Sequence, residues 1–119
     1  MKSKFLFIVL TYLACIGVVQ AQTSNVRTPM NVGQVLSFSI MVGAAESQCV
    51  SLYEIIQNGW PQARDILISD LVASRKTPEE ATVMVEKTYV SGRSAPEQSG
   101  ILKSCDYALS ELQKFNKQF

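Results

Sequence analysis

The sequence predicts an all-α protein that folds as a compact bundle of four, or alternatively five, helices. Apolar residues recur at alternating spacings of three and four along several stretches, which is the period of one helix face. Capping residues precede some of these stretches, and two cysteines lie on the apolar faces of the first and the last. A chain of 119 residues is long enough for one such domain.

The first predicted helix begins after Asn31, a suitable N-cap, and ends at Asn58-Gly59. Its apolar stripe consists of Val35, Phe38, Val42, Ala45, Cys49, Leu52 and Ile56. Small residues at positions 43–45 would let another helix approach closely. A strand over 35–42 is the alternative, but it needs a break before Cys49, and we therefore prefer the helix.

The second predicted helix begins at Trp60-Pro61, because proline suits the first helical turn. Its apolar face comprises Ala63, Ile66, Leu67, Leu71 and Val72. Three charged residues are expected to point away from the core: Arg64, Asp65 and Asp70. Arg75-Lys76 is typical of a C-terminal end, where cations oppose the helix dipole.

The third predicted helix has the clearest start signal, an N-cap threonine followed by proline and two glutamates at 77–80. It ends at Ser91-Gly92, and its inward residues are Ala81, Met84, Val85, and Thr88 or Tyr89. A similar pattern at 94–97 predicts a fourth helix that extends to about Lys117. Its stripe consists of Ile101, Cys105, Ala108, Leu112 and Phe115.

Residues 1–21 have the pattern of a secretory signal peptide: two lysines, an apolar stretch over 5–19 and small residues before a cleavage point. The apolar stretch is shorter than the about 20 residues that a membrane-spanning helix needs. Cleavage is expected after Ala21, which leaves a flexible polar arm at 22–30 and a helical domain at 31–119. The mature protein is then periplasmic or secreted, and not an integral membrane protein.

Cys15 offers an alternative to simple cleavage, since Leu13-Ala14-Cys15 has some likeness to a lipid-attachment motif. Tyr12 stands where that motif expects leucine, so the favoured interpretation removes Cys15 with the signal peptide. Cys49 and Cys105 then remain, and a pair of cysteines in an exported chain favours a disulfide over two buried thiols. Such a bond would join the first and last helices and stabilise the fold by roughly 4 kcal/mol.

The composition excludes several classes of function. Loss of the two lysines at positions 2 and 4 with the signal peptide leaves nine basic and ten acidic residues, which gives no basic face for nucleic acid. The chain has no histidine, C-x-x-C motif or phosphate-binding glycine loop, so we expect no enzyme, no metal and no cofactor. Glu79-Glu80 is the obvious carboxylate pair, and helix capping explains it.

Four residues are candidates for binding a partner. Trp60 is expected in a short turn between helices, where a large aromatic side chain is either a contact residue or a staple that closes the bundle end. Arg75, Lys76 and Arg93 are expected as exposed turn charges that could meet an acidic partner, with ordinary solvated charge as the alternative.

The arrangement of Cys49, Cys105 and the four predicted helices resembles the small periplasmic immunity proteins that neutralise type VI secretion amidase effectors. The resemblance covers the whole mature chain and is one of architecture. It implies a cleaved signal, a compact helical domain and an internal disulfide. It also implies a binding protein that inhibits a peptidoglycan amidase through an exposed loop or helix end, with a homodimer as one arrangement.

Two other functions fit a short, exported helical chain. A periplasmic stress chaperone would expose apolar surface at low pH, when the ten acidic groups of the mature chain are protonated. A structural component of the envelope would need no ligand. An inhibitor predicts a stoichiometric complex with a cell-wall enzyme, whereas a chaperone predicts pH-dependent suppression of aggregation without a fixed partner.

Overall fold

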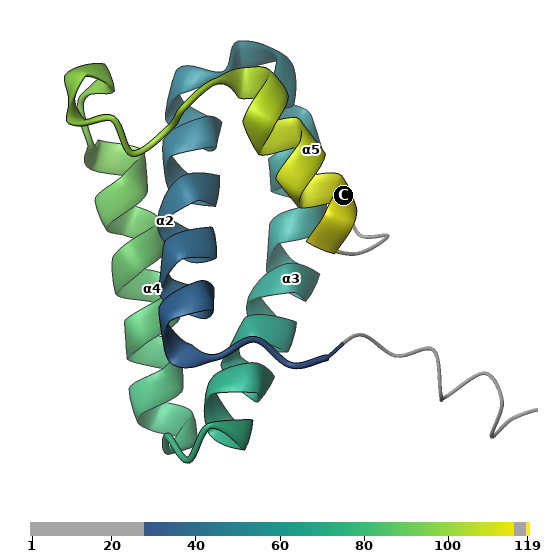
Figure 1. Cartoon of the computed structure of the whole chain (residues 1–119), viewed down its shortest axis with the longest axis vertical. Helices are drawn as coiled ribbons and strands as arrows, with labels where there is room; N and C mark the ends of the chain where they lie inside the picture. The colour runs from purple at the N-terminus through teal and green to yellow at the C-terminus, as the bar shows by residue number, and fades with distance from the viewer. Residues whose placement is uncertain (1–27, 116–118) are drawn as a thin grey trace, which may run out of the picture.

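The computed structural model describes residues 28–115 and 119, and in this part of the chain every regular element is helical (Figure 1). The elements are α2 (Val32–Gln48), η1 (Val50–Leu52), α3 (Tyr53–Ala73), α4 (Pro78–Ser94), η2 (Glu97–Ser99) and α5 (Cys105–Phe115). The predicted all-α bundle is therefore confirmed. The predicted signal peptide at 1–21 lies outside the described residues, as do residues 22–27 of the predicted arm.

Helix α2 lies at the centre of the bundle, with α4 along one side and with α3 and α5 on the other (Figure 1). The side chain of Asn31 accepts a hydrogen bond from the Gln34 N–H, and the Gln34 side chain accepts one from the Asn31 N–H, both at 2.9 Å. This capping box confirms Asn31 as the N-cap. The helix carries one charged residue, Glu46, which suits its contacts with three other helices.

Helices α2 and α4 cross at two glycines. A Cβ atom added to Gly43 would overlap the backbone carbonyl oxygen of Tyr89, and one added to Gly92 would overlap that of Ile40. The close approach predicted from the small residues at 43–45 is thus confirmed, with α4 as the partner helix. The predicted helix end at Ser91-Gly92 is wrong, because α4 continues to Ser94 and uses Gly92 as its contact point.

The predicted boundary between the first two helices is also wrong. Helix α2 ends at Gln48, Cys49 has an extended conformation (φ −116°, ψ 92°), and the chain bends by 112° into α3. Asn58-Gly59, the predicted stop, lies inside α3. The apolar spacing gave no sign of the bend because Leu52 in η1 and Ile56 in α3 are also buried.

Pro61, which was expected to begin a helix, lies inside α3 instead. Proline there lacks the N–H that would bond to the carbonyl of Gln57, a residue exposed to solvent. Asp70, expected to point outward, is only 6% exposed, and its Oδ2 accepts a hydrogen bond of 3.0 Å from the Met30 N–H. This bond fixes the residue before the α2 cap against α3.

The last helix begins later than the pattern at 94–97 predicted. Pro96 leads into the 3-10 turn η2, and Gly100 follows in the left-handed conformation with φ 75°. Helix α5 therefore starts at Cys105, and the predicted stretch to Lys117 is described only as far as Phe115. The N-cap of the third predicted helix is confirmed, since the Thr77 hydroxyl accepts a hydrogen bond from the Glu80 N–H.

The disulfide predicted between Cys49 and Cys105 is present, with the two Cα atoms 5.8 Å apart. It joins the C-cap of α2 to the first residue of α5, which are the first and last helices of the described chain. Near the other end of α5, the Phe115 ring stacks on Phe38 of α2 at 4.5 Å between ring centroids. Helix α5 is thus attached to α2 near both of its ends.

Within the described residues, no one helix combines the length and the apolar character needed to cross a membrane. The segments Val32–Gln48 and Val50–Ala73 meet that requirement only when they are taken together, across the 112° bend.

Candidate functional site

The structure brings two of the four candidate binding residues, Trp60 and Arg93, together around Tyr89. Trp60 lies inside α3, is 7% exposed, and stacks on the Tyr89 ring at 4.3 Å. Its predicted position in a turn is therefore wrong. Arg93, expected in a turn, lies in the last turn of α4 with its guanidinium carbon 5.7 Å from the centroid of Tyr89. The stack joins α3 to α4.

A buried carboxylate completes this cluster. Glu46 of α2 is 8% exposed, and its Oε1 lies 3.9 Å from Arg93 Nη1. Its Oε2 is buried without a hydrogen-bond partner. The distance to Arg93 is too long for a strong charge-assisted hydrogen bond. Because Trp60 and Glu46 are covered by neighbouring helices, this cluster serves the packing of three helices and offers little surface to a partner.

Arg75 and Lys76 lie at the opposite end of α3, in the turn that leads into α4 (Figure 1). Arg75 has φ 72°, and its N–H donates to the Val72 carbonyl, while the Lys76 N–H donates to that of Leu71. These bonds close the C-terminus of α3. Arg75 and Lys76 precede the first residue of α4, whereas Arg93 lies in its last turn and Trp60 in the first half of α3, so the four candidates do not form one site.

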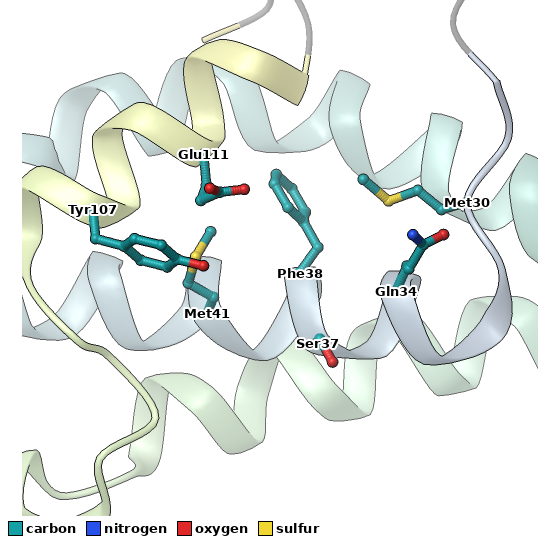
Figure 2. Close-up of a pocket in the computed structure, with 7 residues that line it drawn as sticks. All are labelled: Met30, Gln34, Ser37, Phe38, Met41, Tyr107 and Glu111. Atoms are coloured by element: carbon teal, nitrogen blue, oxygen red, sulfur yellow. The ribbon is translucent and has the colours of Figure 1, made fainter.

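A recess between α2 and α5 gathers a different set of residues (Figure 2). Its volume is about 260 Å³, just below the range of about 300–1,000 Å³ that is usual for small-molecule pockets. The lining residues come from the segment before α2, from α2 and from α5: Met30, Gln34, Ser37, Phe38, Met41, Tyr107 and Glu111. We call this set the α2–α5 groove.

The apolar part of the groove rests on the core. Phe38 is 7% exposed and Met41 8% exposed, and the stacking of Phe38 on Phe115 fixes its ring. Tyr107, in contrast, is 40% exposed, and the Lys103 Nζ lies 5.0 Å from its ring centroid. The groove therefore has a rigid apolar floor and an aromatic wall that is open to solvent.

The polar part of the groove contains one charged residue among the seven, Glu111. Its side chain is 31% exposed, and Lys114 Nζ lies 3.5 Å from its Oε1. At the other end, the side-chain oxygen of Gln34 is occupied by the capping hydrogen bond to Asn31. Figure 2 shows the Glu111 carboxylate on the groove side of α5, between Tyr107 and Phe38.

The outer face of α4 is a second surface with exposed apolar side chains. Val83 is 62% exposed and Val90 44% exposed, and a shallow depression extends from Thr82 to Ser91. This face is formed by one helix, whereas the α2–α5 groove has walls from two. Within residues 28–115 and 119, no three His, Cys, Asp or Glu residues are grouped so as to hold a metal ion.

Phe38 belongs to the predicted apolar stripe of the first helix, whereas Tyr107 and Glu111 are not among the predicted core or site residues. Those two are four residues apart on α5, and that spacing puts them on one face of a helix. The spacing of Tyr107 and Glu111 in the sequence therefore indicated one wall of the groove. The residues of the opposite wall could not be predicted, because they depend on how α5 lies against α2.

No protein-family profile, no curated protein and no solved structure matches this chain.

Proposed function

We propose that this chain is an exported binding protein that holds a protein partner at the α2–α5 groove. The observation that carries the proposal is the groove itself, an apolar recess with one carboxylate at its edge. Binding sites typically combine such apolar surface with a few polar groups that fix orientation. Methionine adds a side chain that adapts to the shape of what it contacts.

The frame around the groove supports this proposal. The disulfide ties one end of α5 to α2, and the stack of Phe115 on Phe38 holds the other end. The capping box and the bond from Met30 to Asp70 fix the start of α2. A recess that is formed before binding loses less conformational entropy when a partner occupies it.

The resemblance of this chain to amidase immunity proteins suggests the first partner to test. That partner is a cell-wall-degrading amidase of the type VI secretion class. The groove would hold a side chain of the amidase, while the surrounding surface covers its catalytic cleft. This part of the proposal rests on the resemblance in helix arrangement and disulfide position.

The experiment is capture of partners from envelope extract with the wild-type protein and with two tyrosine variants. Tyr107→Ala removes the groove wall, and Tyr53→Ala removes a tyrosine of similar exposure, 50%, on α3. We expect the wild type and Tyr53→Ala to retain one cell-wall hydrolase at a fixed stoichiometry and to inhibit its digestion of peptidoglycan. Tyr107→Ala should bind it at least about tenfold more weakly, as for an aromatic contact residue.

Three outcomes would contradict the proposal. A mixture of unrelated clients, bound more strongly at low pH, would favour a chaperone. If Tyr107→Ala and Tyr53→Ala bound the hydrolase with equal affinity, the contact would lie outside the groove. If no hydrolase were recovered from the envelope extract of the native organism, the proposed inhibitor role would be wrong.

A further inference from the structure

The charge distribution of the α2–α5 groove restricts what it can hold. Of its seven lining residues, Glu111 is the charged one, and α2 contributes no charge to the groove. A partner group that places a carboxylate next to Glu111 would meet a like charge, and the two lysines at the rim, Lys103 and Lys114, already contact Tyr107 and Glu111. A wholly apolar group would leave the partly desolvated Glu111 carboxylate without a strong partner.

The contact that Glu111 has in the free protein is weak. Lys114 lies 3.5 Å away, but its side chain is 71% exposed, and such surface ion pairs contribute little free energy. The Glu111 side chain is less exposed, at 31%, and lines the groove. A cation that enters the recess can therefore displace Lys114 and meet the carboxylate in a less hydrated setting.

The neighbours of Glu111 suit the stem of a long cationic side chain. Lysine and arginine carry apolar methylene groups that pack along apolar surface while the charged head remains polar. Met41 and Phe38 form such a surface on the floor of the recess, next to Glu111 (Figure 2). The Tyr107 ring contacts one cation in the free protein, the Nζ of Lys103 at 5.0 Å from its centroid.

We propose that the α2–α5 groove takes an arginine side chain of the partner, with its stem on Met41 and Phe38 and its guanidinium on Glu111. Arginine fits better than lysine because its planar head can bond to a carboxylate through two N–H groups and can stack on an aromatic ring. The volume of about 260 Å³ suits one such side chain. This inference rests on the proposed function and adds the chemistry that the groove recognises.

The test uses N-acetyl-arginine methylamide as a probe and N-acetyl-citrulline methylamide as its uncharged isostere. The protein carries ¹³C-methyl-methionine, so that Met30 and Met41 report from the groove and Met84 from α4. We expect saturable shifts at Met30 and Met41 with arginine, no shift at Met84, and at least about threefold weaker binding of citrulline.

Two matched variants separate the charge from its surroundings. Glu111→Gln keeps the shape of the groove and should weaken arginine binding by about threefold to tenfold, to the level of citrulline. Glu54→Gln changes an exposed glutamate on α3 and should leave the arginine affinity unchanged. Circular dichroism of both variants checks that the helices are intact.

Equal binding of arginine and citrulline to the wild type would overturn the inference, and this comparison needs no variant. Equal shifts at Met84 would also overturn it, because they would show non-specific binding. Its failure is distinguishable from failure of the proposed function. If Tyr107→Ala abolishes capture of the hydrolase and Glu111→Gln does not, the groove binds the partner without recognising a cation.

Discussion

At the scale of single residues, two glycines determine how closely the central helices pack. Gly43 and Gly92 lie where the backbones of α2 and α4 meet, and a methyl group at either position would overlap a carbonyl oxygen of the other helix. Glycine in a helix interior is unfavourable by about 1 kcal/mol relative to alanine. The packing of α2 against α4, which glycine at these positions permits, offsets this lower helix propensity.

Gly92→Ala should lower the free energy of unfolding by at least about 2 kcal/mol, because overpacking against backbone exceeds the gain in helix propensity. Urea unfolding followed by circular dichroism measures this change. Gly33→Ala is the control, since its added Cβ would lie 3.5 Å from Asn31 Oδ1, an ordinary contact. The control should be neutral or slightly stabilising, and equal stability of Gly92→Ala and the wild type would contradict the close crossing.

At the level of helices, some ends are fixed by capping hydrogen bonds from nearby side chains. Other ends depend on tertiary packing. Thr77 begins α4 through its own side chain, with its hydroxyl accepting from the Glu80 N–H at 3.1 Å. The end of α2 has no comparable side-chain signal. It ends at Gln48, and the following residue, Cys49, has a backbone N–H that still bonds to the Ala45 carbonyl while its own conformation is extended.

Thr77→Ala should lower the free energy of unfolding by about 1 kcal/mol, because the N–H that the hydroxyl satisfies loses its partner. Thr77→Ser keeps the acceptor and should retain most of the wild-type stability. Thermal unfolding of the two variants measures the difference. If they were equally destabilised, the loss would come from the threonine methyl group and not from the cap.

At the scale of the whole molecule, the bundle depends on a covalent link between its first and last helices. Helix α5 contacts α2 but is separated from α4 by the width of α2 (Figure 1). The bond between Cys49 and Cys105 therefore fixes the helix that forms one wall of the groove. Stability and binding at the groove should both depend on it.

The double variant Cys49→Ala/Cys105→Ala should lower the free energy of unfolding by roughly 4 kcal/mol, through the added entropy of the unfolded chain. The cavity left at Cys49, which is 2% exposed, would add to this loss. Reduction of the wild type by dithiothreitol avoids that cavity and should also weaken partner capture. Unchanged urea midpoints after reduction would show that α5 is held by packing alone.

The fold class, the disulfide and the caps at Asn31 and Thr77 could all be predicted from the amino-acid sequence. These features follow from the period of apolar residues and from side chains that bond within a few positions. Partner-binding roles for Trp60, Arg75, Lys76 and Arg93 stay predictions, although the structure shows that Trp60 is buried.

The bend after Gln48, the continuation of α3 through Pro61 and the burial of Asp70 depend on how the helices pack, and the sequence pattern did not predict them. The same holds for the α2–α5 groove, whose two walls are far apart in the chain. The physical reason is the same in each case. A stripe of apolar residues shows that a segment is buried, but the direction of the next helix depends on which surfaces pack together.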